Sequence, residues 1–532
     1  MSGMVGIFSS NDLGENSIHL RRMVESMRHE EWYSKGQETL DEDHVSIGWV
    51  SHGDDHDDIE CCKNESGIVA LLCMGGIVGG HEVSGNYASH IIHLYEKRGE
   101  AFVEDLNGCF CGILVDQKQR KAFVFNDRFG AKRIFLCQLK GTICFASEAK
   151  ALLAMSPDLR QFDPTGVSEL LTCGCTIGER SLYKGIEVLP PASICVVERG
   201  SILKKMRYFD PREWTGQEKL EEKEFLSQIR GRMGQLVRRC TQSRQQVGIS
   251  LTGGLDSRIV AACLDDKHTG VHCYTFGSMY RETFDVQVAR EVSRVSGFPH
   301  SVITLGQEFL ELFPAYLNRA VYVSDGYLGI SGAAELYLNA QVRAIAPMRV
   351  TGNYGGELLR GDRAFKHHAS RISLISQDLI GHIQETEPAF RRFEDVDPLT
   401  FALFRQVPYM GYGRMAIEQS QVALRTPFLD NDLVRLVYSA PSRLLKGPKV
   451  STYIISSYNP SLLSIPTDRG LLSGKGLAGR QLLNSYREVL FKAEYWSSHG
   501  MPGWLSRVSS FGLGRILQNN FLGRHKFQHY LT

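Results

Sequence analysis

One stretch constrains the fold of this chain more than any other: residues 250–258, which read SLTGGLDSR. Residues 246–249 predict a short apolar strand before it, and residues 259–264 predict the first turns of a buried helix after it. Gly253 and Gly254 let backbone N–H groups approach an anion, Thr252 and Ser257 can donate hydrogen bonds, and a helix N-terminus adds partial positive charge. We therefore expect a phosphate-binding turn between a strand and a helix.

Asp256 is the acidic residue of this turn. Its carboxylate would repel a bare phosphate, so it predicts a bound divalent cation. The turn is not a Walker-type loop, because residues 250–258 lack the Gly-Lys-Ser/Thr ending. The structural alternative is a glycine-rich turn in an ordinary doubly wound α/β domain.

Composition narrows the class of protein. With 532 residues, two or more domains are expected. A formal net charge of +1 with 43% apolar residues argues against a nucleic-acid or acidic-membrane surface. The most apolar run, residues 67–80, is too short and glycine-rich to span a bilayer, and the N-terminus does not resemble a secretory signal. The 13 cysteines contain no CxxC pair, which suits reduced thiols in a cytoplasmic protein.

The predicted secondary structure changes in type once along the chain. The first ~200 residues are rich in predicted strands, among them residues 67–74, 109–115, 121–126 and 143–146. Residues 221–239 predict a helix that leads into the glycine-rich turn. Helical and strand patterns then alternate, with strands at 271–276, 300–305 and 348–351, which predicts a parallel sheet with crossover helices. We place the domain boundary between residues 208 and 209.

Further motifs accompany the turn, in a characteristic order. They are residues 106–110, 126–130, 145–150, 181–186 and 189–191 in the first half, and 274–277, 351–357 and 424–430 in the second. Together they resemble the glutamine-hydrolysing asparagine synthetases, and the turn itself resembles the SGGxDS loop of the ATP pyrophosphatases, with Thr252 in place of the first serine. The chain also resembles diverged relatives of that family, the β-lactam synthetases and lasso-peptide cyclases.

The resemblance implies an architecture of two domains. Residues 1–208 would form a four-layer αββα sandwich of the N-terminal-nucleophile type, which is the class II glutamine amidotransferase fold. Residues 209–532 would form the α/β ATP-pyrophosphatase domain with its parallel sheet. In the family the first domain releases ammonia from glutamine. The second activates a carboxylate as an acyl-adenylate, which an amine then attacks.

The first domain departs from the family at the residues that hydrolyse glutamine. Ser2 stands where the family has its nucleophilic cysteine, and an alcohol is a much poorer nucleophile than a thiol. The strand that would hold glutamine through Asn-Gly-Glu reads Met74-Gly75-Gly76, and no arginine lies near residues 48–50 to bind the glutamine carboxylate. We therefore expect a glutaminase-like domain without glutaminase activity.

The second domain keeps more of the family's site. The resemblance assigns ATP to a set of loop and strand residues: Ser250, Leu251, Thr252, Gly253, Gly254, Asp256, Ser257, Phe276, Thr351 and Gly352. It assigns Mg²⁺ to Asp256 and Glu357, because Asn353 and Gly356 replace two acids of the family's Ser-Gly-Glu-Gly-x-Asp-Glu segment. The expected catalytic residues are Glu357, Tyr354, Lys449 and Arg469. Lys446, Lys449 and Arg469 are the candidates for the family's catalytic lysine, and each could equally be a solvated surface residue.

Three other residues of this domain are open to two interpretations. Arg258 could reach a phosphate or an acidic substrate, or it could pair with a neighbouring carboxylate. Asp285 and His300 occupy family-like positions, but Asp285 could be a helix N-cap and His300 a strand-end histidine. Glu357 could carry proton transfer or only cap the helix that follows.

The leading functional hypothesis is an ATP-dependent carbon–nitrogen ligase that releases AMP and pyrophosphate. Its partners would be ATP with Mg²⁺, a carboxylate-bearing small molecule or peptide, and an amine or ammonia, with a homodimer left open. Two alternatives remain: an intramolecular macrolactam or β-lactam cyclase, and a catalytically retired scaffold or regulatory subunit. The lost acids at Asn353 and Gly356 favour the retired scaffold, whereas the intact 252–257 loop opposes it.

Overall fold

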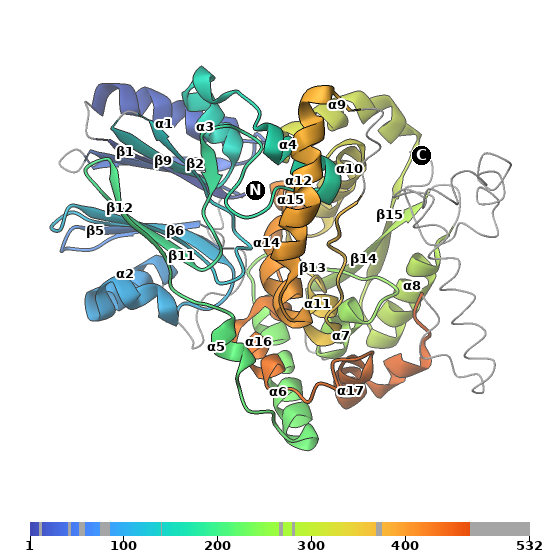
Figure 1. Ribbon diagram of the computed structural model, residues 1–532. Coiled ribbons are helices and arrows are strands. Elements are labelled where there is room, and N and C mark those ends of the chain that lie inside the picture. The colour runs from blue at the N-terminus through green and yellow to red at the C-terminus, as the bar shows by residue number, and fades with distance from the viewer. Residues whose placement is uncertain are drawn as a thin grey trace. The chain divides into compact units, whose positions relative to one another are not determined.

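The computed structural model describes residues 1–9, 13–40, 44–52, 59–74, 86–139, 141–264, 270–278, 282–368 and 375–468. The chain forms two compact units that are discontinuous in sequence (Figure 1). Unit 1 comprises Met1–Lys219, Arg319–Gly329 and Gly361–Ser439, and unit 2 comprises Leu220–Asn318, Ile330–Arg360 and Ala440–Thr532. The domain boundary after residue 208 stays a prediction.

Unit 1 contains two antiparallel sheets. The first has the strand order β10 (Ile186–Val188), β8 (Phe135–Leu139), β9 (Thr142–Ala146), β1 (Gly3–Ser9), β3 (Val45–Ser51), β2 (Ser34–Leu40). The second has the order β12 (Ser201–Arg207), β11 (Ser193–Glu198), β7 (Lys121–Asn126), β6 (Phe110–Asp116), β5 (Ile68–Met74), β4 (Ile59–Lys63). Figure 1 shows α1 (Leu13–Met27) and α3 (Ala149–Met155) over the first sheet and α2 (Tyr87–Arg98) over the second.

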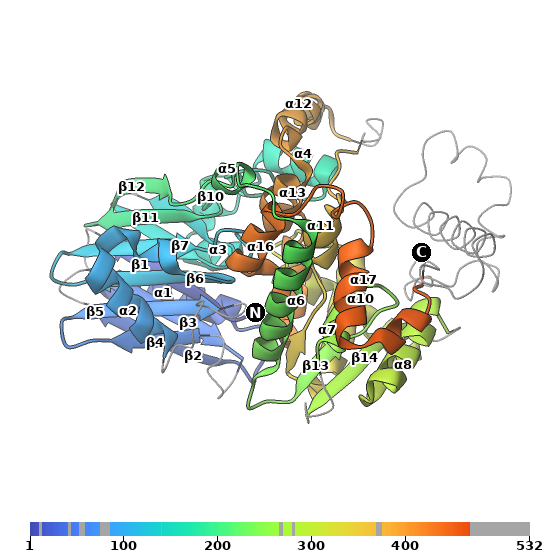
Figure 2. The same ribbon diagram turned by 90° about the horizontal axis from the view of Figure 1, so that it is seen from below.

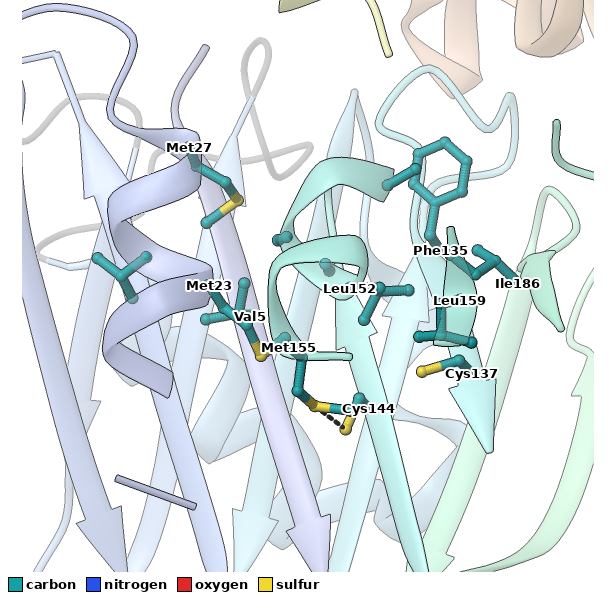
Figure 3. Close-up of a cluster of buried hydrophobic side chains, with 14 of the residues drawn as sticks. Val5, Met23, Met27, Phe135, Cys137, Cys144, Leu152, Met155, Leu159 and Ile186 are labelled. Carbon is teal, nitrogen blue, oxygen red and sulfur yellow. Dashed lines mark hydrogen bonds between the residues drawn. The ribbon is translucent and has the colours of Figure 1, made fainter. Parts of the chain in front are cut away.

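The alternation of side chains along β1 explains why the strand is buried on both faces. Met4 and Phe8 point into the layer between the sheets, where they meet residues of β5, β6 and β7. Val5 and Ile7 point the other way, under α1 and α3, where Met23, Leu152 and their neighbours cover them (Figure 3). A third cluster joins α2 to the outer face of the second sheet. The predicted four-layer αββα sandwich is confirmed.

Unit 1 has further elements between the strands of the sandwich and after them. They are a 3-10 helix over Gly99–Asp105, α4 (Pro164–Cys173), α5 (Arg212–Thr215), α12 (Gln377–Glu394), α13 (Pro398–Phe401), a π-helical turn over Ala402–Gln406, α14 (Val407–Met410), α15 (Tyr412–Gln421), β17 (Ala423–Arg425) and α16 (Asn431–Tyr438). Helix α12 packs on α4, and Phe365, Phe390 and Phe401 form an aromatic cluster with Cys173, the last residue of α4, and Cys175. This cluster gives the later segments of unit 1 a core of their own.

Unit 2 is built on parallel strands. They pair in the order β15 (His300–Leu305), β14 (Val271–Ser278), β13 (Val247–Ser250), β16 (Met348–Val350). The helices are α6 (Glu222–Thr241), α7 (Asp256–Ala262), α8 (Phe284–Ser296), α10 (Ile330–Ile345), α11 (Gly355–Arg360) and α17 (Lys449–Tyr458), with α9 (Gln307–Val323) running on into unit 1. Helix α17 packs against α6 and α7 (Figure 2). The predicted parallel sheet with crossover helices is confirmed.

Two predictions from composition can be compared with the structure. All 13 cysteines are free thiols, and 11 of them are buried, so they serve as small core residues rather than as a disulfide framework. Within the described part of the chain, no helix is long and apolar enough to cross a membrane.

Candidate functional site

The strand order of unit 2 creates a topological switch point. The chain passes from β13 to β14 and β15 on one side, and then returns to β16 on the other side of β13. In open parallel sheets a crevice forms where the order reverses, outside the carboxyl ends of the strands. Ile249 on β13 lies opposite Val350 on β16, so the segments after both strands leave the sheet at the same edge. These segments are residues 251–255, the glycine-rich turn, and 351–354.

The two segments touch so closely that glycine is required. A Cβ on Gly352 would lie 2.5 Å from the backbone nitrogen of Ser257, and a Cβ on Gly355 would lie 2.7 Å from the Cβ of Asp256. Neither position leaves room for a side chain. The structure therefore brings together two parts of the predicted ATP site that lie about a hundred residues apart: Thr252–Ser257 and Thr351–Gly352.

The turn is closed by its own hydroxyls. The backbone N–H of Thr252 donates to Ser257 Oγ at 3.0 Å, the two hydroxyl oxygens lie 2.9 Å apart, and the N–H of Gly254 donates to Thr252 Oγ1 at 3.3 Å. Ser257 is buried. The hydroxyls expected to meet a phosphate thus first shape the turn, and an anion that enters must compete for them.

A carboxylate accepts another backbone N–H of the turn. The N–H of Gly253 donates to Asp285 Oδ1 at 2.6 Å. Burial, together with the charge of Asp468, raises the pKa of Asp285 to about 7, and the Gly253 hydrogen bond opposes this rise. The N-cap interpretation of Asp285 is wrong, because Thr283 caps α8 by accepting from the Val286 N–H and Asp285 lies in the first turn.

Arg258 fastens a distant segment to the turn. Its guanidinium is fully buried and donates to the carbonyl oxygens of Leu462 at 3.1 Å and Ile465 at 2.6 Å. Burial lowers the pKa of Arg258 to about 10, and the Asp468 charge opposes this. The segment so held places Asp468 beside Gly253, whose carbonyl accepts from the Asp468 N–H at 3.1 Å. The hydrogen bonds of Arg258 go to main-chain carbonyls, a role that neither sequence interpretation anticipated.

The predicted metal ligand Asp256 has a basic partner. Both outer nitrogens of Arg360 donate to the Asp256 carboxylate, Nη1 to Oδ1 and Nη2 to Oδ2, each at 2.8 Å. The two side chains are about one-fifth exposed, with 18% for Arg360 and 24% for Asp256. Nη1 of Arg360 also donates to Ser451 Oγ on α17 at 3.4 Å. Sequence reasoning missed Arg360, although a cation three residues after Glu357 was a signal that could have been weighed.

The acidic segment after β16 has an unusual backbone. Tyr354 has a φ of 74°, the left-handed region that glycine prefers, and it stands where the family pattern has glycine. Asn353 is exposed, Tyr354 and Glu357 are half-buried, and Glu357 lies in the first turn of α11. Thr351 is buried and its hydroxyl accepts from the Asn353 N–H at 3.1 Å. The catalytic roles of Tyr354 and Glu357 stay predictions.

The other predicted ATP contacts lie on the strands. Leu251 is fully buried, and its N–H donates to the Tyr274 carbonyl at 2.9 Å, so its side chain belongs to the core. Ser250 ends β13, and Phe276 is half-buried on β14. His300 begins β15, as the strand-end interpretation expected, with its Nε2 2.9 Å from Thr275 Oγ1. Burial lowers the pKa of His300 to about 4.

The predicted catalytic cations lie in different surroundings. Lys449 begins α17, is 56% exposed, and its Nζ lies 2.8 Å from Glu222 Oε1. Arg443 pairs with the same carboxylate, and Lys446 is exposed. Arg469 lies outside the described residues. The role of the family lysine stays a prediction for all three candidates.

The residues around Asp256 do not fit the predicted magnesium site. Mg²⁺ requires oxygen ligands in near-octahedral geometry, whereas the Asp256 oxygens are both engaged by Arg360. Two of the family's acids are replaced by Asn353 and Gly356. Throughout the described ranges, no three His, Cys, Asp or Glu side chains gather as a group able to hold a metal ion.

In unit 1, Ser2 lies at a buried position at the edge of the sandwich. It is 3% exposed, and its carbonyl accepts from the Cys73 thiol at 3.3 Å. Gly48 lies on β3 opposite Val5, in a strand whose segment 48–50 offers no cation. The Met74 side chain, Gly75 and Gly76 lie outside what the structure describes, so their predicted part in losing glutamine recognition stays a prediction.

A buried charge cluster near the N-terminal strand was missed at the sequence level. Glu148 contacts His29 Nε2 at 2.7 Å and pairs with Lys150, which also pairs with Asp325 at 3.0 Å. Burial raises the pKa of Glu148, but its contacts with His29 and Lys150 outweigh burial and hold that pKa well below its usual range. Burial lowers the pKa of His29 to about 4, so the imidazole is neutral near pH 7. The cluster ties strand ends and helices of unit 1 together.

The two units define a class of protein by fold. An αββα sandwich of the N-terminal-nucleophile type is joined in one chain to a parallel-sheet unit with a Thr-Gly-Gly-x-Asp-Ser turn at its switch point. A glutamine amidotransferase domain model matches residues 82–209, and an asparagine synthase model matches residues 228–405. The chain belongs to the asparagine synthetase superfamily.

Individual relatives are distant. Asparagine synthetase [glutamine-hydrolyzing] 2 of Bacillus subtilis (strain 168) is 26% identical over 313 residues, 53% of this chain and 41% of the relative. Asparagine synthetase [glutamine-hydrolyzing] 3 of the same organism is 29% identical over 402 residues, 66% and 64% of the two chains. The matched part thus spans about half the length of these curated relatives.

Among solved structures, the glutamine phosphoribosylpyrophosphate amidotransferase from B. subtilis matches 72% of this chain and 89% of its own. The identity is 10% and the TM-score 0.28.

Proposed function

We propose that the chain is an ATP-dependent carbon–nitrogen ligase that adenylates a substrate carboxylate and does not hydrolyse glutamine. The observation that carries this proposal is the closed turn 252–257 lying against Gly352 at the switch point of a parallel sheet. A turn of this kind at this place in the fold suits the phosphates of a nucleotide. The asparagine synthase model over residues 228–405 supports the same class of reaction.

The chemistry would proceed in two displacements. A carboxylate oxygen of the substrate attacks the α-phosphorus of ATP, and pyrophosphate leaves with the electron pair of the broken P–O bond. An amine or ammonia then attacks the acyl carbon, AMP leaves, and the nitrogen loses a proton. In this scheme the 252–257 turn orients the phosphates, and Glu357 is the candidate base.

Loss of glutamine hydrolysis is supported by residue chemistry. Ser2 lacks the thiol, and the 74–76 and 48–50 segments lack the groups that would bind glutamine. The amidotransferase match begins only at residue 82, after all of these positions. The amine would then be a separate substrate or a group within the same substrate, as in an intramolecular cyclase.

ATP–pyrophosphate exchange against a panel of carboxylates tests the proposal. We expect exchange with one class of carboxylate, and a fall of at least about tenfold, ~1.4 kcal/mol, in Thr252→Val, which removes the hydroxyl that closes the turn. Thr241→Val is the matched control, because the Thr241 hydroxyl donates to carbonyl oxygens of its own helix, α6.

Glu357→Gln should abolish product formation while ATP still binds. If Glu357 only caps α11, turnover stays and stability falls by roughly 1 kcal/mol or less.

A second function, a catalytically retired scaffold, is favoured by one observation. Arg360 holds both oxygens of Asp256, and Asn353 and Gly356 replace acids. ATP binding in calorimetry without exchange on any carboxylate would support the scaffold and contradict the ligase.

A further inference from the structure

Arg360 provides the positive charge that a phosphate site containing an aspartate, here Asp256, requires. Asp256 lies in the turn where phosphates would bind, and an uncompensated carboxylate there would repel them. In this structure Arg360 faces that carboxylate through two parallel hydrogen bonds of 2.8 Å. A bidentate arginine–carboxylate pair of this kind is among the stronger and more directional ion pairs.

The pair is held in place by the fold on both sides. Arg360 is the last residue of α11, which is anchored by the buried Leu358 and Leu359 and begins at Gly355 against the Asp256 side chain. Asp256 begins α7, whose next residues are buried. The two charges therefore meet because two packed elements deliver them to one point, whereas a surface pair between mobile side chains would lack such support.

The pair also disfavours a divalent cation at Asp256. Each carboxylate oxygen already accepts one hydrogen bond from Arg360, and the guanidinium neutralises the charge that would attract a metal ion. Asn353 carries a neutral amide and Gly356 has no side chain. Neither residue therefore supplies a negative charge that would help to bind a metal ion.

We propose that Arg360 replaces a divalent cation at Asp256, so that nucleotide binds to this turn without requiring Mg²⁺. This inference rests on the proposed function, because it takes the ligand of the turn to be ATP. It assigns Arg360 a role in binding through the neutralisation of Asp256 and leaves the chemical steps to other groups.

The two possible roles of Asp256 predict opposite effects of the same substitution. If Asp256 holds Mg²⁺, Asp256→Asn weakens ATP binding. If Arg360 neutralises Asp256, Asp256→Asn removes one negative charge beside the turn while Arg360 stays, and ATP should bind tighter in EDTA by several-fold. Arg360→Gln should do the reverse and weaken ATP binding in EDTA by about tenfold or more. The double variant Asp256→Asn/Arg360→Gln, an uncharged pair of similar shape, should return close to the wild-type affinity.

Calorimetry of ATP binding to the full chain, in EDTA and in Mg²⁺, tests the proposal, with circular-dichroism melting to establish that each variant folds. Where Arg360→Gln does not fold, Asp256→Asn and the comparison of wild-type binding in EDTA and in Mg²⁺ still decide the proposal, because both keep the arginine. Wild-type affinities within about threefold in the two conditions support the inference.

Three outcomes would count against it. Binding in Mg²⁺ alone, or weaker binding by Asp256→Asn, overturns the inference and leaves the proposed function standing. No ATP binding in either condition overturns both.

Discussion

At the scale of single residues, Asp285 links its own protonation to the glycine-rich turn 251–255. Its carboxylate accepts the Gly253 N–H at 2.6 Å from a buried position, close to the like charge of Asp468. Burial favours the neutral, protonated form of Asp285, and the nearby charge of Asp468 disfavours the ionised form further. The state of this one carboxyl therefore affects both stability and the charge that an entering anion meets.

This yields a prediction of pH dependence. The folded pKa of about 7 lies above the ordinary 3.8, so the folded state binds the extra proton between these values, and its stability falls as pH rises toward 7. Relative to Asp285→Asn, the wild type should lose about 1 kcal/mol per pH unit between pH 5 and 7 and show no further change above about pH 8. Melting temperatures of both proteins across this range measure the difference.

The matched control is Asp378→Asn. Asp378 is also in the first turn of a helix, α12, but it is exposed. Asp378→Asn therefore controls for the exchange of a first-turn carboxylate for an amide. If Asp285→Asn differed from the wild type in the same way as Asp378→Asn at every pH, burial of a protonated Asp285 would be refuted.

At the scale of elements, the turn from β16 into α11 combines strain with a candidate catalytic phenol. A tyrosine at φ 74° costs of order 1 kcal/mol relative to a residue that accepts this region. Glycine accepts it freely, although it also adds entropy to the unfolded chain. The tyrosine at position 354 thus has no advantage for the backbone of this turn.

Substitution at Tyr354 separates backbone from side-chain roles. Tyr354→Gly should leave the free energy of unfolding within about 1 kcal/mol of the wild type, and Tyr354→Val should lower it by about 1–2 kcal/mol, because a β-branched residue tolerates positive φ poorly. Urea unfolding of both variants measures this. Exchange activity that vanishes in the stable glycine variant would assign Tyr354 to the chemistry, whereas equal stability of the glycine and valine variants would contradict the strain.

At the scale of the whole molecule, the αββα unit is held together by hydrophobic packing between its layers. Residues from both sheets fill the layer between them, and Ser2 is buried directly before β1. Packing of this kind does not depend on a catalytic thiol, so the fold can form with serine at position 2.

We expect no glutamate release from glutamine, with or without ATP. Ser2→Cys should not restore it, because a thiol alone does not supply glutamine recognition. Coupled detection of glutamate with purified wild type, Ser2→Ala and Ser2→Cys measures this. Robust release by the wild type that disappears in Ser2→Ala would show a working serine nucleophile and reverse this expectation.

Local patterns were enough to predict the elements and the turn. Residues 121–126 form β7 over the predicted range, 300–305 form β15, and the strand before and helix after the 250–258 stretch are present. Apolar alternation, glycine and hydroxyl residues act over a few neighbouring positions, so a single sequence carries them. The closure of Thr252 onto Ser257, five residues apart, is of the same local kind.

The partners of the charged residues were decided by tertiary structure. Arg360 reaches Asp256 from 104 positions away because β16 returns beside β13, and Arg258 binds carbonyls more than 200 positions later. An ionisable side chain pairs with whatever the sheet order and packing bring within a few ångströms, and this distance is a property of the whole fold. The sequence by itself therefore determined the secondary-structure elements and the glycine-rich turn, whereas the fold alone decided that an arginine, rather than a second acid, would face Asp256.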